Sequence, residues 1–357
     1  MIAFNVGAVL VMAVTLIAAY ISPDFFIFPA YLSLILPATI FVNAFFVLFW
    51  MISRKWMFLL SLSILLLSAS QISNTFSFRF GKTKATAITK PIKLLSYNTW
   101  RCSRITKPTK KSPNNVIQYA LETNADIICL QEFTVSEDEK YLTLKDVMKL
   151  FRKYPYSHIA FNKSKSTRKE GIATFSKYPI INKQRIGYPS DNNLSIYSDI
   201  NVDGEIIRMI NNHLESNRLT ENDKSRPISL KENFDADSLS GITLYFSKKL
   251  ASAYKLRAVQ ADSVAQVVES SPYKVIMCGD FNDVPGSYVY TKAKCYLTDA
   301  FSESGFGMGW TFNEKYFHFR IDYVMYDALG FDLIKFKTEK VKYSDHLPVL
   351  CTLNIKK

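Results

Sequence analysis

Three apolar runs open this 357-residue chain, and none of them contains a charged residue: Ile2–Ile21, Phe25–Met51 and Trp56–Ser73. Each is close to the length that crosses a bilayer, and the third is the shortest. A buried soluble bundle is one alternative, but helices that are polar on no face leave no side for water. A signal peptide is an alternative for the first run, but no basic segment precedes it and two apolar runs follow. The pattern therefore predicts a membrane anchor of about three transmembrane helices over residues 1–78.

The charges beside these runs predict which side of the membrane the rest of the chain faces. Arg54 and Lys55 lie in the short loop between the second and third runs, and the positive-inside rule places such a loop in the cytoplasm. With three spans, the C-terminal part then lies outside, although Arg79 and the lysines after it pull the other way. Because short loops count most, we expect an integral protein of the plasma (inner) membrane with its C-terminal domain on the external, or periplasmic, side.

A small, polar and basic linker over residues 79–91 separates this anchor from a different pattern. Eight apolar segments are predicted to be strands: Ile92–Tyr97, Asp126–Leu130, Gly171–Ser176, Ser195–Val202, Ile206–Asn211, Lys274–Cys278, Ile321–Tyr326 and Val349–Leu353. Helical spacing occurs at Asn114–Thr123, Leu142–Phe151 and Lys248–Ser270. Helices separate the early and late strands, with a run of strands between them, which predicts a mixed α/β domain over residues 92–357. The polar stretch Asn217–Gly241 has no periodicity and is predicted to be a loop insertion.

Six of the strand-like segments deliver a carboxylate, an amide or an imidazole at their ends: Asn98, Glu132, Asn212 with His213, Asp280 with Asn282, Asp322, and Asp345 with His346. Any one of these is explained by a polar turn. Their convergence from several strands is how α/β folds build sites. None of the five cysteines has CxxC spacing, so no zinc site is indicated. Carboxylate and amide oxygens suit Mg²⁺ or Mn²⁺, and the set predicts metal-dependent phosphoester hydrolysis.

The segments LSYNTW, LQE, NNHLES, GDFND, RIDYV and SDHLPV, in this order, resemble the endonuclease/exonuclease/phosphatase superfamily. The resemblance extends from about Ile92 to the C-terminus and leaves the first 78 residues outside it. It implies a four-layer αββα sandwich, in which two mostly antiparallel sheets pack together with helices outside. It also implies hydrolysis of a phosphoester with Mg²⁺ or Mn²⁺ as the cofactor.

The resemblance implies roles for residues at matching positions. Glu132 and Asp345 resemble the metal ligands, and Asn98 resembles a residue that supports the metal or the phosphate. Asp280 resembles the group that orients and activates the attacking water. Asn282 resembles the phosphate-binding amide beside it.

Two histidines complete the implied catalytic set. His346 resembles the catalytic histidine, with Asp322 as the partner that orients it and raises its pKa. His213 resembles a second histidine that acts as a general acid in the nuclease and sphingomyelinase branches. Trp100 departs from the pattern, because apurinic endonucleases place an aspartate there. This departure weakens a DNA-repair assignment and leaves the metal site more dependent on Glu132.

The substrate is less clear from the sequence. The chain carries a net charge of +13, of which +1 lies in the first 78 residues. Two basic stretches, Arg101–Lys111 and Lys163–Lys169, are either solvated loops or an electropositive rim for an anionic substrate.

Three functions follow from these patterns. A membrane-anchored phosphodiesterase acting on lipid or lipid-linked headgroups is favoured, because a tethered domain meets headgroups at high effective concentration. An externally facing nuclease acting on DNA or RNA is the second hypothesis. A non-catalytic membrane adaptor is the third, and the intact set of site residues argues against it. Lipid against nucleic acid and monoester against diester stay open, and no protein partner is indicated.

Overall fold

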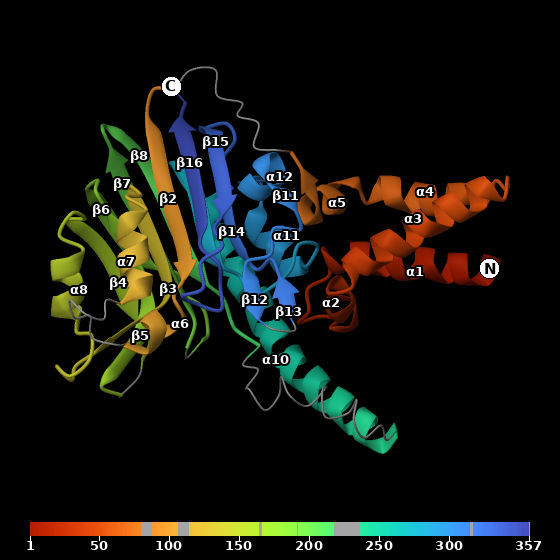
Figure 1. Ribbon diagram of the computed structural model, residues 1–357, viewed down its shortest axis with the longest axis horizontal. Helices are drawn as coiled ribbons and strands as arrows, with labels where there is room; N and C mark the ends of the chain where they lie inside the picture. Colours follow the sequence, from red (N-terminus) through yellow and green to blue (C-terminus); the bar gives the residue numbers. More distant parts are fainter. Residues whose placement is uncertain are drawn as a thin grey trace.

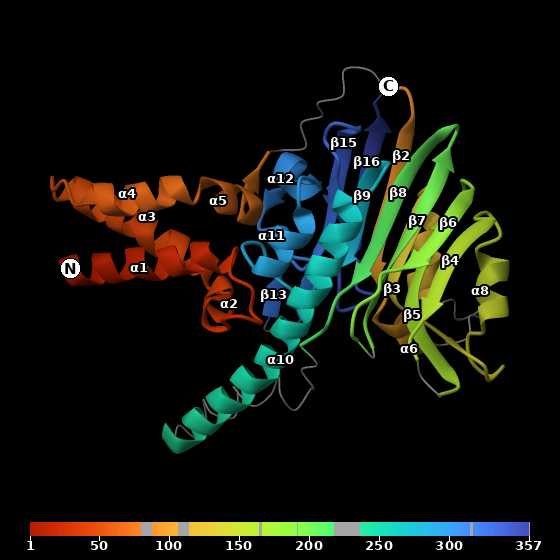
Figure 2. The ribbon, with the colours of Figure 1, turned by 180° about the vertical axis from the view of Figure 1, so that it is seen from behind.

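The computed structural model describes residues 1–79, 88–105, 114–163, 166–190, 192–217, 236–314 and 317–356. A group of N-terminal helices projects from two stacked sheets that carry helices on their outer faces (Figures 1 and 2). The helices of the N-terminal unit are α1 (Ile2–Ala18), α2 (Phe28–Ser33), α3 (Leu36–Ile52), α4 (Phe58–Leu67) and α5 (Ala69–Thr75). The remaining helices are α6 (Trp100–Ile105), α7 (Asn115–Glu122), α8 (Leu144–Leu150), α10 (Ala236–Glu269), α11 (Tyr288–Lys294) and α12 (Ala300–Ser304).

Each of the two large sheets has six strands. The first has the order β15 (Phe331–Thr338), β16 (Val349–Ile355), β2 (Pro91–Asn98), β3 (Ile127–Ser136), β5 (Arg168–Ser176) and β4 (Tyr156–Phe161). The second has the order β10 (Thr298–Asp299), β14 (Asp322–Tyr326), β9 (Lys274–Asp280), β8 (Glu205–His213), β7 (Leu194–Val202) and β6 (Ile180–Arg185). Neighbouring strands are antiparallel except for one parallel pair in each sheet, β2–β3 and β8–β9. Two short pairs join β1 (Ser77–Phe78) to β11 (Phe306–Gly307) and β12 (Phe312–Glu314) to β13 (Phe317–Phe319).

Three apolar clusters hold these layers together. Alternate residues of the central strands, such as Leu94 and Cys278, fill the space between the sheets. The opposite face of the first sheet packs on α7 and α8, and that of the second packs on α10 and α11. The period of two along each strand explains this division, because successive side chains point to opposite faces. The predicted α/β fold of two stacked, mostly antiparallel sheets is confirmed, with each sheet mixed rather than purely antiparallel.

Local chemistry sets several element boundaries as the sequence predicts. The Asn114 side chain accepts the Ile117 N–H at 3.2 Å and caps α7. The helix α10, however, begins at Ala236 rather than Lys248, so the predicted loop over residues 217–241 is wrong at its C-terminal end. The part of that loop over residues 218–235 lies outside the described residues.

The prediction of three membrane-spanning helices does not hold as stated. Among the described residues, no individual helix has both the length and the apolar character needed to cross a membrane. The helices α4 and α5 satisfy the test together, but they bend by 68° where they meet. The second apolar run is divided into α2 and α3, each of which carries a proline in its first turn. Proline favours a helix start and cannot donate the backbone hydrogen bond that would continue a preceding helix.

The N-terminal unit docks on one side of the sandwich, beside α10, α12 and β11 (Figures 1 and 2). Tyr31 of α2 donates a hydrogen bond to the Ser247 carbonyl at 2.7 Å, and its ring contacts the ring of Tyr254. Arg320 donates to the Asn74 carbonyl at the end of α5. The β1–β11 pair completes the junction, so the unit is joined to the same side of the domain by a helix, an arginine and a strand.

His158 gives the fold a pH dependence that can be measured. The ring is buried on the edge strand β4 and contacts Ser198 Oγ at 3.0 Å. Burial, and next the nearby Lys183 charge, lower the pKa of His158 to about 4. The unfolded chain therefore takes up the proton first, so the stabilisation is complete above pH 6.5 and is lost as the pH falls towards 4. Between pH 7.5 and 4.5, we expect the free energy of unfolding to fall by about 1–2 kcal/mol less in His158→Gln than in the wild type, with solvent screening taken into account. Urea unfolding at the two pH values measures the difference. Equal pH slopes for both proteins would contradict it.

Candidate active site

Asp280 lies at the centre of a polar cluster where β9 ends. Its carboxylate is 1% exposed and accepts three hydrogen bonds. Oδ1 accepts the Asn282 backbone N–H at 2.8 Å, and Oδ2 accepts the Asn98 amide at 2.9 Å and the Asn282 amide at 3.3 Å. Burial, opposed by the His346 charge and reinforced by Asp322, raises the pKa of Asp280 to about 6. At neutral pH the group is therefore an oriented carboxylate with a pKa close to that of a general base.

Gly279 allows β8 and β9 to approach each other at this point. It has a φ of +126°, and a Cβ atom there would lie 2.0 Å from the Asn212 carbonyl oxygen. Only glycine fits such a close approach of two backbones. The parallel register then pairs His213 with Asp280, which explains why the NNH and GDFN segments form one site.

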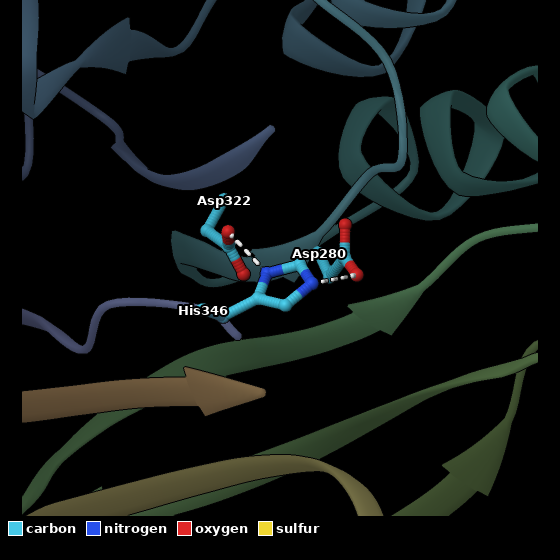
Figure 3. Close-up of side chains that lie close together, drawn as sticks. All are labelled: Asp280, Asp322 and His346. Carbon is cyan, nitrogen blue, oxygen red and sulfur yellow. Dashed lines mark hydrogen bonds and ion pairs between the residues drawn. The ribbon is translucent and has the colours of Figure 1, made fainter. Parts of the chain in front are cut away.

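His346 and Asp322 form a buried pair beside Asp280 (Figure 3). His346 Nδ1 lies 2.8 Å from Asp322 Oδ2, and Nε2 lies 3.8 Å from Asp280 Oδ2. Burial alone would lower the pKa of His346, but the Asp322 and Asp280 carboxylates outweigh it and raise the pKa well above its ordinary value. The two carboxylates therefore favour the protonated imidazole, and the role predicted for Asp322 stays a prediction.

His213 has a different electrostatic state. Its Nε2 is buried without a hydrogen-bond partner among the described residues, 3.9 Å from Asp280 Oδ2 and 4.0 Å from Glu132 Oε1. Burial lowers the pKa of His213, so the ring is neutral at pH 7. The space beside this nitrogen, between two carboxylates, is one that a bound polar group would complete.

Glu132 reaches this space from the middle of β3 rather than from its end. The backbone at Glu132 has a φ of +50°, and the pairing of β3 with β5 is irregular between Leu130 and Phe133. Such a bulge re-aims a side chain. Burial, and next the Glu170 charge, raise the pKa of Glu132 to about 7. Asp345, which is half-buried, adds to this effect.

The predicted metal ligands and the tightest cluster of metal-binding groups are different residues. Ligand atoms of Asp280, Asp322 and His346 lie within 4.8 Å of one another, the single such group found among the described residues. However, His346 Nδ1 is already hydrogen-bonded to Asp322, so this group is an Asp322–His346 pair with Asp280 in ion-pair contact at 3.8 Å. Asn98 also has both amide atoms engaged, because its Oδ1 accepts the Trp100 N–H at 3.1 Å. Asn98 therefore orients Asp280. Glu132 belongs to the predicted metal ligands, and a bound cation would offset the burial and neighbouring negative charge that raise its pKa.

Several supporting residues escaped sequence reasoning. Thr311 Oγ1 accepts the backbone N–H groups of Ile321 and Asp322, both at 3.0 Å, and so fixes the start of β14. Ser344 Oγ donates to the Asn98 carbonyl at 2.9 Å and joins the SDH segment to β2. Ser344 adjoins a recognised motif and could have been found from it. Thr311 lies in a short connection with no pattern to mark it.

The two basic stretches are only partly described. Within them, Arg101 pairs with Glu170 at 3.1 Å and Lys169 pairs with Glu137 at 3.3 Å. These pairs reduce the positive charge available at the predicted rim. Residues 106–113 and 164–165 lie outside the described residues.

A two-sheet sandwich with buried Asp and His groups at its strand ends is a phosphoesterase-type fold. Residues 95–346 match the Endonuclease/Exonuclease/phosphatase family, and the chain belongs to that family. Residues 1–75 match a domain of unknown function. No curated protein matches the chain.

Solved structures agree with this fold. An endonuclease/exonuclease/phosphatase from Beutenbergia cavernae DSM 12333 is 13% identical with a TM-score of 0.50, and the match covers 75% of this chain and 72% of that one. The human Nocturnin catalytic domain, with a bound sulfate anion, is 15% identical with a TM-score of 0.51, and the match covers 76% of this chain and 97% of that one. At these identities the likeness establishes the fold and nothing finer.

Proposed function

We propose that this protein is a divalent-metal-dependent phosphodiesterase whose substrate carries a lipid or lipid-linked headgroup. The main observation behind this proposal is the position of Asp280. Asn98 and Asn282 hold its carboxylate between a cationic His346 and a neutral His213. This set offers a base for water and two hydrogen-bond donors for phosphate within one buried cluster.

The donor set also fits a hard cation. Glu132 has a raised pKa because it is buried near other carboxylates, Glu170 and Asp345. A divalent cation relieves this repulsion, and oxygen donors suit Mg²⁺ or Mn²⁺. We assign Glu132 and Asp345 as the residues that would hold it. When bound, such an ion polarises a phosphoryl oxygen and stabilises charge on the leaving oxygen.

Asp280, His346 and His213 have separate roles in the proposed reaction. Asp280 Oδ2 orients a water and accepts its proton, while Asn98 and Asn282 keep the carboxylate in place. His346, held by Asp322, donates from Nε2 to the phosphoryl oxygens as negative charge develops on them. A neutral His213 with its proton on Nε2 would donate a hydrogen bond in the same space, a role that differs from the predicted general acid.

The N-terminal unit supports a membrane location through its exposed apolar surface and its buried polar contacts. Beside an apolar cluster that includes Met12 and Leu36, its interior contains a polar network, in which Asn5 donates to Ser61 Oγ at 2.6 Å and Ser61 donates to Asn43 Oδ1 at 3.0 Å. These three side chains are fully buried, whereas Phe4 is 74% exposed and Leu67 is 76% exposed. In water such an apolar exterior is costly, but in lipid polar contacts hold helices together and apolar side chains face outward.

The dimensions and charges of the unit are compatible with this location. At 1.5 Å per residue, the 17 residues of α1 or α3 extend roughly 25 Å, against a hydrocarbon core of about 30 Å. The N-terminus and the α3–α4 turn lie at the end away from the catalytic domain (Figures 1 and 2). Arg54 and Lys55 in that turn favour a cytoplasmic tip and an external catalytic domain at the inner membrane.

A substrate panel tests the proposal with the full-length chain reconstituted in vesicles. We expect hydrolysis of bis(p-nitrophenyl) phosphate in Mg²⁺ or Mn²⁺, a loss of at least about 10²-fold in EDTA, and recovery when the metal is restored. The protein should float with the vesicles. Phosphatidylglycerol should be cleaved faster than p-nitrophenyl phosphate, plasmid DNA or RNA. Metal-independent activity would overturn the mechanism, and no hydrolysis at all would favour the adaptor hypothesis.

A nuclease is the second candidate, favoured by a polar cavity of about 580 Å³ on the His213 side of the site. Lys163, Arg185 and Tyr188 line it together with Glu215, two residues after His213. Cationic and aromatic groups of this kind suit a hydrophilic anion such as a nucleotide. Cleavage of nucleic acid alone in the same panel would decide for this function.

A further inference from the structure

A second cavity, the α12–β15 pocket, lies on the other side of the catalytic histidine and has no role in the mechanism above. Its volume is about 880 Å³, within the size range of pockets that bind small molecules. Its apolar lining comes from α12, β11, β15 and the connections between them: Phe301, Phe306, Met308, Trp310, Phe336 and Leu347. The pocket is therefore suited to a largely apolar ligand.

The charged side chains that line the pocket are lysines, so their charge is positive. Lys337, Lys340 and Lys342 lie on the segment that leads from β15 to the catalytic histidine, and Lys340 and Lys342 are exposed. None of the described residues that line the pocket is acidic. An apolar cavity with a lysine rim is complementary to an anionic amphiphile, which has both an apolar chain and a negative headgroup.

The pocket and the catalytic centre share one wall. Phe312 pairs with His346 in an antiparallel bridge, the Asn313 N–H donates to the Asp345 carbonyl at 2.9 Å, and the Leu347 N–H donates to Thr311. Phe312 and His346 face the catalytic side, where their rings lie 5.1 Å apart. Their neighbours Asn313 and Leu347 face the pocket instead. A pocket ligand therefore contacts the segment that carries both His346 and Asp345.

The pocket also adjoins the N-terminal unit. Its rim residue Phe306 contacts Phe78, with ring centroids 6.1 Å apart, and β11 pairs with β1 directly after α5. The unit leaves the domain on the side where α12, β11, β12 and β13 lie (Figures 1 and 2). A ligand resident in the same apolar phase as α1–α5 therefore lies next to the pocket rim.

We propose that the α12–β15 pocket binds the apolar chain of an anionic, phospholipid-like phosphoester, with Lys340 and Lys342 facing its charged headgroup. This assignment rests on the proposed phosphoesterase function and identifies its substrate class. The pocket is a specificity element: it raises the affinity for long-chain phosphoesters, while a short soluble phosphodiester reaches Asp280 and His346 without it.

Photo-crosslinking locates the ligand without relying on turnover. The probe is a dodecyl phosphate with a diazirine in its chain, applied to the full-length protein in vesicles and mapped by mass spectrometry. We expect labelled peptides from residues 301–310 and 336–347, protected by phosphatidylglycerol and not by its deacylated headgroup, glycerophosphoglycerol. Labelling confined to the N-terminal helices would overturn the proposal, and protection by oligonucleotides would point to nucleic acid instead.

Variants separate the pocket from the catalytic centre. Met308→Trp fills the pocket, and Lys340→Glu with Lys342→Glu reverses the rim charge; each should reduce pocket labelling about tenfold. Lys149→Glu with Lys153→Glu, on and just after α8 at the far side of the domain, makes the same charge change as a control and should leave labelling unaltered. All these variants should keep wild-type hydrolysis of bis(p-nitrophenyl) phosphate. If the wild-type protein does not hydrolyse bis(p-nitrophenyl) phosphate, the proposed function is refuted. If the pocket variants are labelled as strongly as the wild type, only the proposed ligand pocket is refuted.

Discussion

His346→Ala is expected to reduce kcat for bis(p-nitrophenyl) phosphate by about 10³-fold, because the site loses its cationic donor to the phosphoryl oxygens. The Asp322 and Asp280 carboxylates hold the imidazole protonated and in one orientation. No other described group shares this position between the two aspartates. His158→Gln is the matched histidine control and should retain wild-type kcat at pH 7.5, since that ring lies on the edge strand β4 and contacts Ser198 on β7 of the other sheet.

Metal titration separates the role of His346 from that of Glu132. Glu132→Ala should also lose at least about 10²-fold in turnover, but with a weaker apparent affinity for Mg²⁺ or Mn²⁺. His346→Ala should keep the wild-type metal affinity, as measured by competition against a fluorescent chelator. Wild-type turnover in either variant would refute the site, and an unchanged metal affinity in Glu132→Ala would move the cation elsewhere.

The polar strand ends of the candidate site could be predicted because the sequence gives them two signals at once. An apolar run of period two predicts the strand, and an Asp, Asn or His directly after it has no reason to be in a core. For Asp280 and His213 these signals predicted polar groups at neighbouring strand ends, and the parallel β8–β9 register brings the two residues together. Glu132 was selected by motif and its metal-binding role stays a prediction, while its place at a bulge inside β3 depends on a positive φ that no pattern of hydrophobicity encodes.

The N-terminal unit was harder to predict for a related reason. Hydropathy is summed over a window, so it registers the apolar character of Phe25–Met51 and overlooks Pro29 and Pro37, which start new helices within it. It likewise overlooks Asn5 and Asn43, which are minor contributors to the average and yet make buried hydrogen bonds inside the bundle. The two prolines and two asparagines shape the unit through their positions in the fold, which an average over composition does not record.

Arg320 joins these two halves of the molecule. Its guanidinium is buried and donates to Asp299 Oδ2 at 2.8 Å, and the same group donates to the Asn74 carbonyl of α5. It also lies over the rings of Phe301 and Tyr323, at 4.4 and 4.7 Å from their centroids. Because Arg320 stands two residues before Asp322, it connects the docked N-terminal unit to the strand that orients His346.

Arg320→Met should therefore lower the free energy of unfolding by about 3–5 kcal/mol, since Asp299 is left as an uncompensated buried charge. It should also speed hydrogen exchange in α5 and reduce bis(p-nitrophenyl) phosphate hydrolysis at temperatures where the protein is still folded.

The matched control is Arg208→Met, which breaks a comparable buried pair with Asp199 at 2.8 Å on β7 and β8, away from α5 and Asp322. That variant should lose similar stability and keep both the α5 protection and the activity. Adding Asp299→Asn to Arg320→Met should recover part of the stability without restoring the contact to Asn74. Equal losses of activity in the two arginine variants would mean that general destabilisation, and not the connection through Arg320, governs the site.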